Sequence, residues 1–220
     1  MQIKKIAKYG IKHKILEKFK YGMLLHFFLT NIKKIGIYIN LFYLYDIKLS
    51  DYPMHRFLDH SYKLKLLKKK DLGDILHMSG YGKPKTDLLN RFNKGEMCYS
   101  IKHERDLVAL YWIIFGPIKK NINNFELKIN KNQVYLYDLF VPREYRGNNL
   151  ATYLESSVQK KLHKKGIKHS IFYVDFFNRP AVRVRKKQNI KPGWLLFNIQ
   201  LFRKYTPNLI IDLSRWRLLK

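Results

Sequence analysis

Apolar residues recur at every fourth position in the second half of the chain, and this spacing predicts an amphipathic helix. Glutamine and lysines fill positions between them, and Gly166 supplies a stop signal. Segments rich in aromatic and β-branched residues, 133–141 and 171–174, flank the helix and predict strands. The apolar stripe consists of Leu150, Leu154, Val158 and Leu162.

The residues upstream predict further strands and two short helices. Glycine and proline separate the helices, and a charged turn at 103–106 joins two strands into a hairpin. A polar, asparagine-rich loop then leads to the strand at 133–141. The predicted strands are 37–45, 62–67, 97–102 and 107–115, and the predicted helices are 71–78 and 85–92.

The turn that enters the long helix is basic and contains a glycine. The first backbone N–H groups of an α-helix have no partner inside the helix, and the helix dipole places positive potential at the same end. Gly147 permits positive φ and close approach of an anion, and Asn148 and Asn149 tolerate left-handed geometry. Arg143 and Arg146 add charge. The turn therefore predicts a phosphate site, with an ordinary strand-to-helix corner as the alternative.

These residues resemble the signature of the GNAT superfamily of acyl-CoA-dependent N-acyltransferases. Val141-Pro142 matches the corner at the end of the family's strand, and Asn178-Arg-Pro-Ala181 matches its later Asn-x-x-Ala/Ser step. Arg143, Arg146-Gly147 and Leu150-Ala151 match the loop Arg/Gln-x-x-Gly-x-Gly/Ala, with Asn149 where the second glycine is usual. The resemblance implies a mixed α+β fold, in which helices flank a mostly antiparallel central sheet.

The resemblance also implies that acetyl-CoA is the co-substrate, that the reaction uses no metal, and which residues hold acetyl-CoA. Phe140 and Val141 would line the pantetheine arm, and Asn178 would contact the cofactor from a neighbouring element. Strands ending at Val141 and near Asp175 would splay apart to form the slot where acetyl meets amine. The loop that holds the pyrophosphate would consist of Arg146, Gly147, Asn148, Asn149, Leu150 and Ala151, with Arg143 beside them.

Two positions depart from the family pattern. Arg185 stands where the family often has a tyrosine that protonates the departing thiolate, so a tyrosine acid is not assured there. Asn189-Ile190 replaces a Gly-Phe pair, and we expect Asn189 to adopt the left-handed turn that a glycine would adopt.

The implied reaction needs a group that takes a proton from the amine and a group that protonates the thiolate. Asp138 and Glu96 are the candidate bases, and Tyr173 is the candidate acid. Each residue has a structural alternative. Asp138 can pair with a lysine, Glu96 can be a charge at a strand edge, and Tyr173 can belong to the core.

The activity implied by the resemblance is transfer of an acetyl or longer acyl group from acyl-CoA, or from an acidic carrier protein, to a primary amine. An amino sugar on a nucleotide or lipid carrier and an amino-acid or peptide amine remain open as acceptors. The net charge of +28 favours a phosphate-bearing or membrane-borne acceptor.

The alternative from another class is a non-catalytic protein of this fold that binds nucleic acid or anionic membrane through its basic surface. No nucleic-acid motif accompanies that charge, which biased codon usage would also explain.

We expect two parts in the chain, a basic N-terminal extension at 1–60 and the acyltransferase domain at 61–220. The first twenty residues predict an amphipathic helix, which either binds anionic lipid or packs on the domain. Without a signal peptide or an uninterrupted apolar span, we expect a cytoplasmic protein, peripheral at the inner face of a membrane if the helix binds lipid.

The remaining reactive residues give weak signals. Cys98 is the single cysteine and lies in an apolar strand, where a core role is more common than a nucleophilic one. The eight histidines show no helical metal spacing, so we expect no zinc site.

Overall fold

The structure is a computed structural model that describes residues 31–53, 61–122, 125–202 and 208–213. These residues form two compact units, a larger one of residues 45–122 and 126–173 and a smaller one that contains the other described residues. The predicted boundary at residue 60 does not coincide with this division. The reason is that strand β1 (Ile37–Lys48), which lies in the predicted extension, pairs antiparallel with β9 (Trp194–Leu201). Residues that are distant in the sequence thus form one sheet. The predicted helix at 1–20 lies outside the described residues.

The larger unit is built on a sheet with the strand order β8-β7-β4-β3-β2. Adjacent strands are antiparallel except β7 and β8, which are parallel. The mostly antiparallel sheet and its flanking helices confirm the predicted α+β class. The strands are β2 (Tyr62–Leu67), β3 (Met97–His103), β4 (Asp106–Phe115), β7 (Gln133–Phe140) and β8 (His169–Asp175).

Helices cover both faces of this sheet. Trp112 of β4 packs against Phe92 of α4 (Lys85–Asn93), while the adjacent Tyr111 donates a hydrogen bond to Glu155 of α5 (Leu150–Lys164) at 3.3 Å. Successive side chains of a strand point to opposite faces, so α4 and α5 lie on opposite sides. The predicted apolar stripe of α5 is buried, as expected. The short α3 (Leu72–Leu76) follows a turn of 3-10 helix at Lys69–Asp71 and packs with α4.

The segment predicted as a polar loop contains two strands. β5 (Ile118–Ile122) and β6 (Phe125–Ile129) pair with each other in a separate two-stranded sheet. Two lysines and one asparagine separate the apolar residues at the ends of β5, so its sequence lacks a clear strand pattern.

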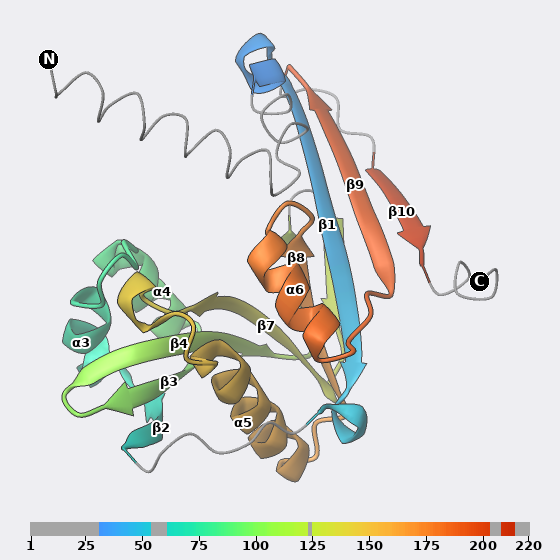
Figure 1. The fold of residues 1–220 in the computed structure, drawn as a ribbon. Coiled ribbons are helices and arrows are strands. Elements are labelled where there is room, and N and C mark those ends of the chain that lie inside the picture. Colours follow the sequence, from blue (N-terminus) through green and yellow to red (C-terminus); the bar gives the residue numbers. More distant parts are fainter. Residues whose placement is uncertain (1–30, 54–60, 123–124, 203–207, 214–220) are drawn as a thin grey trace, which may run out of the picture. The chain divides into compact units, whose positions relative to one another are not determined.

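The smaller unit contains three antiparallel strands in the order β10-β9-β1, and Figure 1 shows them side by side. β10 comprises Asn208–Asp212. The helix α6 (Arg179–Lys187) begins after Asn178, whose side-chain oxygen accepts a hydrogen bond from the Ala181 amide at 3.2 Å. Asn189 follows α6 with φ 56°, so it adopts the left-handed turn that its position predicts.

Candidate active site

Strands β7 and β8 pair only at their beginnings. Their parallel register runs from Gln133 opposite His169 to Tyr135 opposite Ile171, although β7 continues to Phe140. The backbone of β7 beyond Tyr135 therefore has no strand partner on the side of β8. This opening lies where the sequence predicts a splay, and its free edge suits an extended ligand that bonds to backbone.

The turn that enters α5 leaves a row of amides without acceptors. No described group accepts a hydrogen bond from the backbone N–H groups from Gly147 to Thr152, and the first helical bond runs from the Tyr153 amide to the Asn149 carbonyl at 2.9 Å. Gly147 has φ 92°, and a Cβ added there would meet no atom within 4 Å. Asn149 is left-handed with φ 55°. These amides, near the positive end of the helix dipole, can therefore hold a diphosphate.

The two arginines of the turn differ in their contacts. Arg146 donates from Nε to the backbone oxygen of Val141 at 3.0 Å, which ties the turn to the end of the strand. The Arg143 side chain is exposed and makes no hydrogen bond or ion pair to a described residue. Arg146 therefore shapes the turn, and Arg143 contributes positive charge beside it.

Asp138, a predicted base, lies at a bulge in β7. The register with β4 passes from Trp112 opposite Tyr137 to Leu110 opposite Phe140, and Asp138 has φ 54°. Its Oδ2 atom accepts hydrogen bonds from Arg91 at 2.7 Å and Tyr81 at 2.8 Å. A proton taken by Asp138 would weaken this ion pair. The residue is therefore paired, as the structural alternative expected, but with an arginine instead of a lysine.

Arg91 is the centre of this polar cluster. Its guanidinium also donates to Asp87 at 2.9 Å and lies 5.0 Å and 5.1 Å from the ring centroids of Trp112 and Tyr137. Burial alone would lower the pKa of Arg91, but the bond to Asp138 and other neighbours outweigh burial and raise it. Burial, and next the charge of Asp138, raise the pKa of Tyr81, so this phenol remains a donor.

Glu96, the other predicted base, accepts a hydrogen bond from the Tyr137 hydroxyl through Oε2. Its Oε1 atom has no hydrogen-bond partner among the described residues. Burial, followed by the bond to Glu96, raises the pKa of Tyr137 and keeps it protonated. The Glu96 side chain is half-buried. Glu96 is therefore held in place on one oxygen, while the other can take a proton.

Tyr173, the predicted acid, belongs to a row of tyrosines across the splay. Tyr135 stacks on Tyr137 with centroids 5.6 Å apart and on Tyr173 at 6.4 Å. Burial, the nearby Tyr173 and a hydrogen bond with it raise the pKa of Tyr135. Tyr173 lies two residues beyond the last paired residue of β8, where the two strands part.

The smaller unit holds Asn178, the predicted cofactor contact, and Arg185. Asn178 caps α6 through its side-chain oxygen. Arg185 is buried and donates to the Gln188 side chain at 3.0 Å. An arginine in these surroundings is a structural residue of its helix, so the position gives no tyrosine acid.

Sequence reasoning missed the residues that bring this cluster together. Arg91 and Tyr81 bond to Asp138, and Tyr137 bonds to Glu96, across 41 to 57 residues of sequence. No local sequence pattern predicts contacts over such distances. The spacing of Tyr135 and Tyr137 was the one available signal, because residues two apart in a strand share a face. Lys120 of β5 lies over both rings, 5.3 Å and 4.4 Å from their centroids, and gave no signal within its predicted loop.

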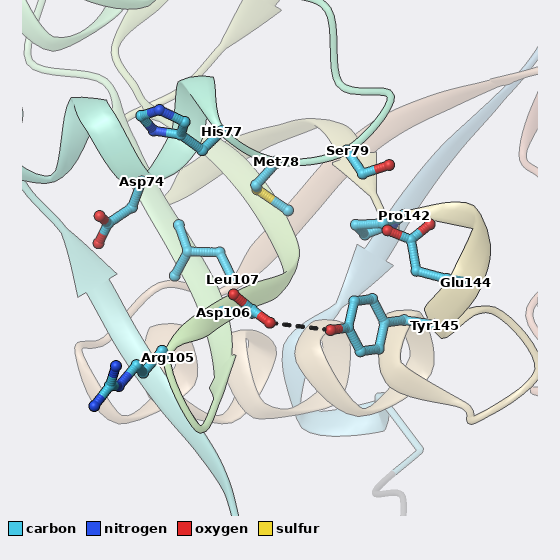
Figure 2. A pocket seen from close by; sticks show the side chains of 10 residues that line it. All are labelled: Asp74, His77, Met78, Ser79, Arg105, Asp106, Leu107, Pro142, Glu144 and Tyr145. Atoms are coloured by element: carbon cyan, nitrogen blue, oxygen red, sulfur yellow. Dashed lines mark hydrogen bonds between the residues drawn. The ribbon is translucent and has the colours of Figure 1, made fainter.

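A cavity of about 370 Å³ lies beside the turn, and Figure 2 shows around it side chains from α3 and the residues after it, from the β3–β4 hairpin and from the segment after β7. Two of the lining residues are joined by a hydrogen bond, which the Tyr145 hydroxyl donates to the Asp106 carboxylate at 3.3 Å. The lining residues are Asp74, His77, Met78, Ser79, Arg105, Asp106, Leu107, Pro142, Glu144 and Tyr145.

Other reactive groups contribute little to this site. Cys98 is fully buried, and burial raises the pKa of its thiol, which makes it a core residue as expected. Within the described ranges, no three side chains of metal-ligating type converge. In the same ranges, no helix has the length and apolarity to cross a membrane.

Comparison with known proteins agrees with this geometry. The family model described as the acetyltransferase (GNAT) family matches residues 70–189, more than half of the chain. The chain therefore belongs to the GNAT family of acetyltransferases. No curated protein matches the sequence at a significant level.

Solved structures share the fold at low sequence identity. A GNAT-family protein from Novosphingobium aromaticivorans is 15% identical, with a TM-score of 0.51 over 80% of this chain and 68% of its own. A GNAT-family acetyltransferase from Colwellia psychrerythraea is 13% identical, with a TM-score of 0.56 over 75% of this chain and 56% of its own. A functionally unknown protein from Staphylococcus epidermidis is 14% identical, with a TM-score of 0.52 over 79% and 66%. The chain thus spans 56% to 68% of the lengths of these proteins, and at such identities the likeness shows the fold alone.

Proposed function

We propose that the protein transfers an acetyl group from acetyl-CoA to a primary amine by direct attack of the amine on the thioester. The observation that carries this proposal is the row of unpartnered amides from Gly147 to Thr152 beside the opening between β7 and β8. Amides at a helix N-terminus suit a pyrophosphate, and an unpaired strand edge suits the amide-containing pantetheine arm.

The residues of the larger unit divide into binding and chemical roles. The turn residues Arg143 and Arg146 to Ala151 hold the pyrophosphate, and Phe140 and Val141 line the arm. When bound, acetyl-CoA supplies an activated carbonyl carbon with thiolate as its leaving group. The proposed acceptors are an amino sugar and an amino-acid or peptide amine, both of which present a primary amine.

Glu96 takes the proton from the attacking amine. Its Oε2 atom is held by Tyr137, and its Oε1 atom has no hydrogen-bond partner among the described residues. Tyr173, on β8 where the strands part, gives a proton to the thiolate. A base is required because an ordinary alkylamine is mostly protonated at neutral pH.

Calorimetric titration with acetyl-CoA tests the donor site, by which we mean the turn residues Arg143 and Arg146 to Ala151 together with Phe140 and Val141. We expect the wild-type chain to bind acetyl-CoA and CoA with similar dissociation constants, because the turn contacts the shared pyrophosphate. Gly147→Glu places a carboxylate beside the phosphates and should abolish binding, a loss of at least about 100-fold.

Gly166→Glu is the matched control, since Gly166 also has positive φ, lies at the other end of the same helix and has open space around its Cα. Both variants carry similar backbone strain and the same charge change. Absence of heat with the wild-type chain, or equal loss in both variants, contradicts the proposal.

A further inference from the structure

The amine of Lys120 rests on an aromatic surface at the mouth of the splay. Its Nζ lies 4.4 Å from the ring centroid of Tyr137 and 5.3 Å from that of Tyr135. Tyr135 is the last residue of β7 that pairs with β8, so the two rings straddle the point where the strands part. The lysine reaches this place from β5, which belongs to a separate two-stranded sheet.

The surroundings of Lys120 are unusual for a lysine. The side chain is half-buried, yet it makes no salt bridge to any described carboxylate and instead lies over the two tyrosine rings. Lysines withdrawn from water are normally paired. Its neighbour Lys119 is 67% exposed and lies 3.6 Å from Glu126, which is the ordinary arrangement for a surface lysine.

Burial lowers the pKa of Lys120 and enlarges its neutral, nucleophilic fraction. The nearby charges act in both directions. Glu96 and Asp87 favour the ammonium, whereas Arg91 and Lys94 oppose it. Glu96 is also the carboxylate proposed above as the base, so the amine lies within electrostatic reach of a proton acceptor.

We propose that Lys120 is itself an acceptor, and that the protein acetylates this side chain from acetyl-CoA bound to the same chain. In this step, a bond forms between Nζ and the acetyl carbon, and the bond from that carbon to sulfur breaks. One proton of the amine passes to Glu96, Tyr173 gives a proton to the CoA thiolate, and proton exchange with water restores both side chains. The products are N-acetyl-lysine and CoA, and no further reactant is needed. The inference rests on the proposed donor site.

Acetylation of Lys120 also alters the aromatic surface. The product has no positive charge, so the attraction between the ammonium and the two tyrosine rings is lost. The unmodified lysine occupies a place where an external alkylamine would otherwise lie, which makes the rings an amine subsite for acceptors of that class.

Mass spectrometry tests the inference on the full chain. The protein is incubated with acetyl-CoA, digested with a protease that does not cut at lysine, and the acetylated fractions of Lys120 and Lys119 are followed over time. We expect Lys120 to react at least about tenfold faster than Lys119, with a rate constant that does not depend on protein concentration. Lys119 reports the uncatalysed reaction of an exposed lysine in the same strand.

Two variants separate transfer at the donor site from simple chemical reactivity. Gly147→Glu should reduce the Lys120 rate to that of Lys119, whereas Gly166→Glu should retain the difference. Lys120→Arg should remove the fast site without abolishing the binding of acetyl-CoA in calorimetry.

Each outcome has a defined meaning. Binding of acetyl-CoA with equal rates at Lys120 and Lys119 overturns the inference and leaves the donor site intact. Fast modification that persists in Gly147→Glu, or a rate constant that rises with protein concentration, also overturns it. Absence of acetyl-CoA binding removes the donor site, and the inference falls with it.

Discussion

The Arg91 guanidinium and the Asp138 carboxylate form an ion pair at 2.7 Å, which joins helix α4 to the residue at which β7 bulges. Their side chains are 11% and 21% exposed, whereas Asp87, the second carboxylate on the same guanidinium, is 40% exposed. The more buried pair therefore fixes the bulge, and the more exposed pair adds an ordinary helical contact.

This difference predicts unequal losses of stability. Asp138→Ala should lower the free energy of unfolding by about 2–4 kcal/mol, because it leaves a largely buried guanidinium without its main partner. Asp87→Ala, the matched control, should cost less than about 1 kcal/mol because its pair is partly screened by water. Urea unfolding monitored by tryptophan fluorescence measures both values. Equal losses would show that burial does not distinguish the two pairs.

Glu96→Gln should impair the chemical step more than the binding of the donor. The glutamine oxygen can still accept the hydrogen bond from Tyr137, so the fold is preserved, but it cannot take a proton. We expect kcat to fall about 100-fold or more and the KM for acetyl-CoA to change less than about threefold. Release of the CoA thiol, with an amino sugar and with a peptide amine as acceptors, measures both parameters.

The exposed Glu126→Gln is the control for that experiment, since Glu126 pairs only with the surface Lys119 among the described residues. If Asp138→Asn lowers kcat more than Glu96→Gln does, the assignment of the base passes to Asp138.

Arg146→Lys separates geometry from charge in the turn. The substitution keeps the positive charge but loses the planar Nε–H that donates to the Val141 oxygen, so the turn is less well held. We expect the dissociation constant of acetyl-CoA to rise about five- to tenfold, which corresponds to about one hydrogen bond. Arg143→Lys, in which charge and exposure are both retained, should change the constant less than about twofold. Calorimetry at fixed salt compares them, and equal effects would refute the distinction.

Asp71 should contribute to stability only above acidic pH. Burial alone would raise the pKa of Asp71, but hydrogen bonds from Lys65 and from the Lys68 amide outweigh burial and lower it below 3.8. A carboxyl whose folded pKa is below its unfolded value stabilises the protein above the unfolded value and loses this effect as pH falls through the folded one.

The measurement is the free energy of unfolding of Asp71→Asn and the wild-type chain between about pH 7 and pH 3. The variant should be less stable by about 1–2 kcal/mol near neutrality, and the difference should shrink below about pH 4. Asp74→Asn, a control in the adjoining helix α3, should lose less than half as much. A difference that is constant with pH would rule out the charged form of Asp71 as its cause.

Most elements could be predicted from the sequence because their patterns are local. The stripe from Leu150 to Leu162 is buried on α5, and the hairpin at 97–115 has the predicted turn. β5 was missed because its two lysines and one asparagine obscure the alternation of apolar and polar residues that is typical of a strand. The predicted boundary at residue 60 differed from the structural division because β1 pairs with β9, more than 140 residues later.

The sequence by itself determined the turn that enters α5, since the amides at the start of this helix lack acceptors as a direct consequence of helix geometry, and Gly147 and Asn149 supply the positive φ values. Tertiary structure alone decided what surrounds it. Arg91 meets Asp138 across 47 residues, Tyr137 meets Glu96 across 41, and Lys120 lies over two tyrosines. Strand register and the bulge in β7 set these contacts, and no periodicity within one segment records how separate segments align.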